Sequence, residues 1–131
     1  MTASITTHII LMAIGVVVLL GAAYIAKTDK GGKQLNTHKM VGGIGVLLLV
    51  LGAIGLLVTG ALKPALPHFW IALLAIVFAI LTPIGGLLFI KAAPQKKAGL
   101  FKSHRFDAMI FFGLAALAVI FGIIGVRPLL H

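Results

Sequence analysis

Residues 38–61 read HKMVGGIGVLLLVLGAIGLLVTGA, and no charged side chain interrupts this run after Lys39. A helix that rises ~1.5 Å per residue needs about 20 apolar residues to cross the hydrocarbon core of a bilayer. The run is long enough to do so, and it begins with a histidine. The stretch therefore predicts a transmembrane helix that carries an imidazole near one end.

Three further runs have the same apolar character, at residues 5–26, 67–90 and 104–126. The four runs take up most of the 131 residues, of which 61% are hydrophobic and 10% are charged. A soluble domain of this length could not cover its surface with so few charges. We therefore expect an all-α integral membrane protein in which residues 1–131 form a single domain, an up-down-up-down four-helix bundle in a lipid bilayer.

The basic residues are unevenly distributed between the segments that join the runs. Nine of the eleven Lys and Arg residues lie within 27–39 and 91–105, and the other two are Lys63 and Arg127. The positive-inside rule then predicts that both termini face the outer, non-cytoplasmic side, as in a bacterial or archaeal inner membrane. The net charge of +9 is best explained by contact with anionic lipid, with an acidic partner as the alternative. No nucleic acid partner is expected.

The chain also reads as two similar hairpins. Thr-His at 7–8 and Pro-His at 67–68 open the first helix of each hairpin, and Thr-His-Lys at 37–39 and Ser-His-Arg at 103–105 open the second. Because both hairpins start on the same side, they form a parallel repeat about an axis along the membrane normal.

Four histidines at the starts of the runs are the candidate metal ligands: His8, His38, His68 and His104. Ionisable residues in membrane spans are costly, so they are functional candidates by default. In an up-down-up-down bundle the first and third helices are diagonal, as are the second and fourth. His8 with His68 near the outer face, and His38 with His104 near the inner face, can therefore each share one centre. Two axial histidines are the ligation of an electron-transfer haem, so we expect two b haems. Zinc is disfavoured because no Cys, Asp or Glu completes either pair.

Small residues follow each histidine on its own helix face, at positions 4, 7, 11, 14 or 18 residues later. The candidate cofactor-facing residues among them are Gly15, Gly42, Gly45, Gly52, Ala75 and Ala118. Such a face would let a flat porphyrin approach the backbone, and the residues at +14, which are Ala22, Gly52, Thr82 and Ala118, would lie near the other haem. The alternative is that small residues are ordinary helix–helix contacts and that the histidines cap helices at the interface.

Three kinds of neighbouring residue complete the candidate site. Lys39 and Arg105 directly follow the inner histidines and would suit haem propionates, although snorkelling to the interface explains them equally well. Met12, Met40 and Met109 are weaker candidates for a mixed axial site. Asp107 is the one acidic residue within a run. We expect it to pair with a nearby cation, and a proton or quinol contact is the alternative.

With these residues in place, the chain resembles the cytochrome b-561 type of four-helix di-haem membrane cytochromes. The resembling stretches are His38-Lys39-Met40-Val41-Gly42 with the later Gly52 and Gly55, and Ser103-His104-Arg105 with Gly122. The resemblance spans nearly the whole chain and implies two haems near opposite faces, each held by histidines from alternate helices. The family's ligands usually lie deeper in their helices, so either these helices extend beyond the hydrocarbon or the haems lie close to the interfaces. The two further helices of eukaryotic members and a recognisable ascorbate motif are absent.

The expected function is electron transfer across the membrane, between a quinone pool and a partner redox protein, as a subunit of a complex. A small multidrug-type transporter is disfavoured because the first three runs contain no carboxylate to couple protons. A cofactor-free scaffold or assembly subunit that packs through its Gly/Ala faces remains the alternative.

Overall fold

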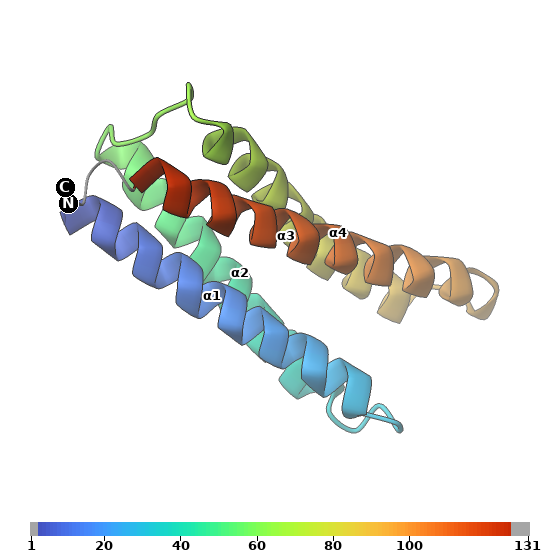
Figure 1. Cartoon of the computed structure of the whole chain (residues 1–131). Coiled ribbons are helices and arrows are strands. Elements are labelled where there is room, and N and C mark those ends of the chain that lie inside the picture. The colour runs from blue at the N-terminus through green and yellow to red at the C-terminus, as the bar shows by residue number, and fades with distance from the viewer. Residues whose placement is uncertain (1–2, 127–131) are drawn as a thin grey trace. The chain divides into compact units, whose positions relative to one another are not determined.

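The computed structural model describes residues 3–126, and this part of the chain contains four helices and no strand (Figure 1). The helices are α1 (Ala3–Thr28), α2 (Leu35–Val58), α3 (Pro67–Lys91) and α4 (Pro94–Val126). The all-α prediction is confirmed. Residues 1–2 and 127–131 lie outside the described part, and with them Arg127, one of the two cations outside segments 27–39 and 91–105.

All four helices are long and apolar enough to cross a membrane. Only 11–17% of the most apolar 18-residue window of each helix is buried within the chain. Large apolar side chains remain exposed, such as Val58 at 78% and Met109 at 70%. Exposed apolar surface of this extent needs hydrocarbon rather than water as its solvent. The chain is therefore a multi-pass membrane protein.

Helices α1 and α2 form the first hairpin, within a compact unit of residues 1–62. Their backbones approach each other closely where Gly15 lies against Gly45, because a Cβ on Gly15 would stand 3.2 Å from the Gly45 carbonyl oxygen. The loop between them is tied by Asp29, whose carboxylate accepts the backbone N–H groups of Lys33 at 3.0 Å and Gln34 at 2.8 Å.

Helices α3 and α4 form the second hairpin, within a compact unit of residues 63–131. Pro67 starts α3 at a position where a missing N–H is harmless. Pro83 lies inside α3, which nevertheless continues to Lys91. The buried residues of this hairpin are alanines with one phenylalanine: Ala72, Ala75, Ala79, Phe111, Ala115 and Ala118.

The helix boundaries differ from the sequence prediction mainly in α4. The hydropathy run begins at residue 104, but the helix begins at Pro94. Proline is favoured in the first turn of a helix, and the Gln, Lys, Ala and Leu residues that follow are good helix formers. The lysines among them interrupt the apolar run, so hydropathy does not mark this part of the helix. His104 therefore lies ten residues inside α4 rather than at its start. Helix α2 runs over 35–58 rather than 38–61, because the chain turns at Gly60 with φ +64°.

Candidate functional site

Each of the four candidate histidines donates a hydrogen bond across its own hairpin to a backbone carbonyl. In the first hairpin, Nδ1 of His8 lies 3.0 Å from the Gly52 oxygen, and Nδ1 of His38 lies 2.9 Å from the Ala22 oxygen. All four imidazoles are half-buried. The rings are therefore held by the neighbouring helix.

The second hairpin repeats the arrangement. Nδ1 of His68 lies 2.8 Å from the Ala118 oxygen, and Nδ1 of His104 lies 2.8 Å from the Thr82 oxygen. The four acceptors are the residues that follow a histidine by 14 positions on its own helix. Each histidine thus contacts the +14 carbonyl of its partner helix, and the contact is reciprocal in both hairpins.

These bonds determine which ring nitrogen can bind a metal. A carbonyl oxygen only accepts, so Nδ1 carries the proton in each neutral imidazole, and the lone pair is on Nε2. A histidine ligand in proteins almost always donates its other ring N–H to a carbonyl, a carboxylate or water, which fixes the tautomer and orients the ring. The donor set therefore fits axial ligation by Nε2 at all four positions.

Two glycines leave room for the imidazoles of the second hairpin. A Cβ on Gly122 would stand 3.1 Å from both Cε1 and Nδ1 of His68, and a Cβ on Gly86 would stand 3.3 Å from Cε1 of His104. Each glycine lies one helical turn after the carbonyl that the same histidine contacts. In the first hairpin a tight contact lies at the carbonyl residue itself, where the Sδ of Met12 would lie 3.2 Å from a Cβ on Gly52.

The small residues that the sequence offered as porphyrin-facing pack between the helices of a hairpin. Gly15, Gly45, Gly52, Ala75 and Ala118 are buried, and Gly42 lies beside Ala22, whose Cβ would be 3.9 Å from a Cβ on Gly42. This packing agrees with the alternative explanation, ordinary helix–helix contacts, and a porphyrin-facing role stays a prediction. The orientation of the histidines is therefore better support for a cofactor than the small residues are.

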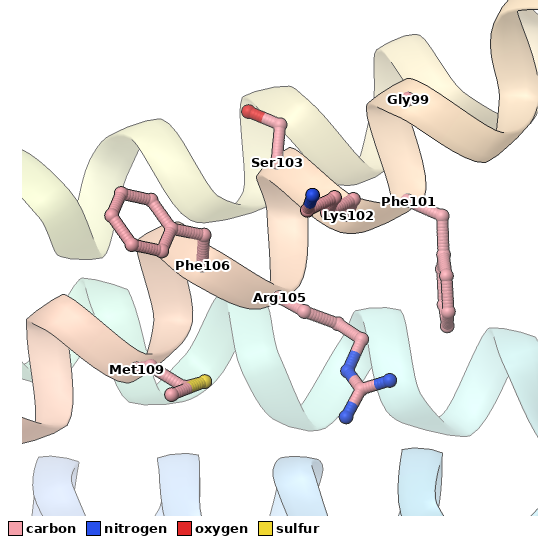
Figure 2. Close-up of a pocket in the computed structure, with 7 residues that line it drawn as sticks. All are labelled: Gly99, Phe101, Lys102, Ser103, Arg105, Phe106 and Met109. Carbon is pink, nitrogen blue, oxygen red and sulfur yellow. The ribbon is translucent and has the colours of Figure 1, made fainter.

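The charged candidates lie on exposed or half-buried parts of the helices. Lys39 and Arg105 are exposed. The Arg105 guanidinium lies over the Phe101 ring, 5.8 Å from its centroid, beside a shallow hollow along α4 (Figure 2). Asp107 is half-buried and turned toward α3, where its Oδ2 would lie 3.8 Å from a Cβ on Gly85.

Sequence reasoning singled out the four histidines but missed the role of the carbonyls. The signal was nevertheless present in the numbering. In an antiparallel hairpin, opposed residues have numbers with a constant sum, and Gly15 with Gly45 has the same sum as His8 with Gly52 and as Ala22 with His38. One known contact between the helices would have predicted the other two.

Within residues 3–126 there is no cluster of three or more His, Cys, Asp or Glu side chains that could enclose a metal ion. A haem iron needs only two axial histidines, so two b haems stay a prediction. No protein-family model, curated protein or solved structure matches the chain.

Proposed function

We propose that the chain is a di-haem b-type membrane cytochrome that carries electrons across the bilayer, between a quinone pool and a partner redox protein, as a subunit of a complex. His8 and His68 would hold the outer haem, and His38 and His104 the inner one. The observation that carries the proposal is the common orientation of the four imidazoles, each with Nδ1 donating to a carbonyl.

The spacing of the histidine levels supports two sites rather than one. In each hairpin, one histidine lies beside a carbonyl 14 residues along the helix that bears the other histidine. Fourteen residues correspond to about 21 Å of helix. Both hairpins therefore separate their two histidine levels by the same length, as two shared ligand pairs would require.

The haems would supply reversible one-electron chemistry at the iron, and the chain would supply their ligation and surroundings. Hydrogen bonding through Nδ1 makes each imidazole a stronger base toward the metal and fixes its plane. Lys39 and Arg105, which directly follow the inner histidines, would offset propionate charge. The nine-to-two bias of cations supports an orientation in which both termini face the outer side, as in a bacterial or archaeal inner membrane.

A cofactor-free scaffold is the second candidate, because the small-residue faces already pack each hairpin and histidine–carbonyl bonds alone can join membrane helices. Either ring nitrogen would serve for that purpose. Both proposals include the Nδ1 hydrogen bonds, and they differ in whether Nε2 binds a haem iron.

The visible spectrum of the purified protein, with and without dithionite, tests the proposal directly. Sharp reduced b-type bands at two haems per chain are expected after expression with sufficient haem. A chain that folds into helices under these conditions and shows no such bands is not a cytochrome.

Asparagine substitutions separate ligation from helix joining. The Asn side-chain amide can donate from about the position of Nδ1 but offers no Nε2. His8→Asn and His38→Asn should each remove one haem and leave the thermal stability of the apoprotein close to that of the parent. His131→Asn is the control, because the proposal assigns no haem to this fifth histidine, and it should keep both haems. Retention of both haems in His8→Asn and His38→Asn would contradict the assigned pairs.

A further inference from the structure

The first ten residues of α4 form a helical extension that precedes the apolar run. The extension is held against the end of α3, where Phe89 and Phe101 are in ring contact at 5.5 Å. Lys97 lies over the Phe89 ring at 5.9 Å, and Arg105 lies over the Phe101 ring at 5.8 Å. The cations and aromatic rings therefore have defined places at this end of the helix.

A shallow hollow runs along α4 from this extension into the apolar run (Figure 2). Its basic lining is Lys102 and Arg105, and its apolar lining includes Phe101, Phe106 and Met109. Figure 2 shows Arg105 and Phe101 extending to the same side of α4. Lys102 and Arg105 therefore bring positive charge to the hollow beside Phe101, and Phe106 and Met109 continue its apolar surface along α4.

Among the described residues, no acidic side chain lines the hollow. The sequence contains two acidic residues, Asp29 and Asp107. Asp29 accepts backbone N–H groups in the loop between α1 and α2, and Asp107 is turned toward Gly85 on α3. An anion bound from outside the chain would supply the missing charge.

The apolar half of the hollow is also uncovered. Phe106 is 60% exposed and Met109 is 70% exposed. Lys102 and Met109 are seven residues apart, which is about 10 Å along the helix axis. A ligand that satisfies both ends must therefore carry an anionic group and an apolar chain that extends at least this far.

We propose that this hollow is a binding site for an anionic phospholipid. The phosphodiester lies between Lys102 and Arg105, and an acyl chain lies along Phe106 and Met109. Basic pockets at the cytoplasmic ends of membrane helices recognise such head groups. A free phosphate would leave the apolar half uncovered. The site shares Arg105 with the proposed inner haem, whereas Lys102, Phe106 and Met109 have no assigned part in haem binding.

Native mass spectrometry of the purified chain, titrated with phosphatidylglycerol or with phosphatidylcholine of the same acyl chains, tests the site. We expect tighter binding of phosphatidylglycerol, and Lys102→Gln should weaken it about fivefold, as expected from the loss of one basic residue near a head group. Lys97→Gln is the matched control, because it removes the same charge from the same helix outside the hollow. It should leave the affinity within about twofold of the parent, on the same scale of one lost charge.

Two further measurements separate a lipid site from a phosphate site. Phe106→Ala should weaken both lipids, because it removes acyl contact. Glycerophosphoglycerol, the head group without acyl chains, should fail to displace bound phosphatidylglycerol. Equal losses in Lys97→Gln and Lys102→Gln, equal binding of the two lipids, or displacement by the head group alone would each overturn the proposal.

Discussion

A histidine in a membrane helix has two ring nitrogens to satisfy where water is scarce. The second hairpin places His68 against the Ala118 carbonyl and leaves space for its ring at Gly122. The fit is close, because the distance from a Cβ on Gly122 to the ring would be 3.1 Å. The space that a glycine leaves at residue 122 is therefore needed by the His68 ring.

Replacing Gly122 should move the His68 ring without adding a side chain that could bind the haem iron. In Gly122→Ala the imidazole must move by a few tenths of an ångström, which lengthens its 2.8 Å hydrogen bond to Ala118. An alanine in the helix interior otherwise gains about 0.5–1 kcal/mol over glycine. Gly113→Ala, with no atom within 4 Å of the new Cβ, should show that gain, and Gly122→Ala should lack it.

Thermal unfolding in detergent measures this difference between the two variants. In the haem-loaded protein, Gly122→Ala should in addition shift the reduction potential of one haem, which Gly113→Ala should not. Equal stability of the two variants would show that His68 does not depend on the space at residue 122.

At the scale of the helices, the first hairpin depends on a close backbone approach. A Cβ on Gly45 would stand 2.6 Å from Cγ of Leu19 and 3.2 Å from the Gly15 carbonyl oxygen. The backbone oxygen cannot turn away as a flexible side chain could. The two helices can therefore accept a methyl group here only by moving apart.

Gly45→Ala should destabilise the protein by about 1–3 kcal/mol, the usual range for an overpacked contact. Gly43→Ala is the control on the same helix, because nothing lies within 4 Å of its new Cβ. Thermal melts of both variants in the same detergent should show a lower midpoint for Gly45→Ala alone. A midpoint for Gly45→Ala at or above that of Gly43→Ala would argue against this contact in the folded protein.

The helices themselves could be predicted from the sequence because hydrocarbon permits few other structures. A spanning segment must satisfy its backbone internally, so an apolar run of about 20 residues predicts a helix whatever its packing. The start of α4 at Pro94 could not be predicted this way. A glutamine and three lysines interrupt the apolar pattern of its first ten residues. These residues are helical through helix propensity and through the contact of Phe101 with Phe89.

The role of the small residues could not be predicted either. A face of Gly and Ala permits a porphyrin or a second helix to approach equally closely, and the sequence does not say which helices pair. The structure assigns Gly15 and Gly45 to helix contact. By contrast, the histidine levels followed from the numbering, because helical rise is constant and each hairpin is antiparallel.

At the scale of the whole molecule, the repeated hairpins and the cation bias predict the same orientation in the membrane. The turn of each hairpin lies next to a cluster of basic residues, at 27–39 and at 91–105, whereas the segment between α2 and α3 carries Lys63 alone. The positive-inside rule acts on each hairpin separately, so both should insert with the same sense. A parallel repeat requires this, because only then do His8 and His68 lie near the same face.

Reporter fusions test that orientation. Alkaline phosphatase, which is active only outside the cytoplasm, should be active when fused after residue 62 or residue 131, and green fluorescent protein should fluoresce when fused after residue 30 or residue 93.

Replacing Lys27, Lys30 and Lys33 by Gln, and adding three lysines to the 59–66 segment, should weaken or reverse the charge bias of the first hairpin while leaving that of the second. The first hairpin would then present its histidines in the opposite order, so both haem sites should be lost together, although no ligand has been changed. If the reporters were to show the hairpins inserted in opposite senses in the parent chain, the pairing of His8 with His68 would fail on geometry alone, because the two residues would then lie near opposite faces.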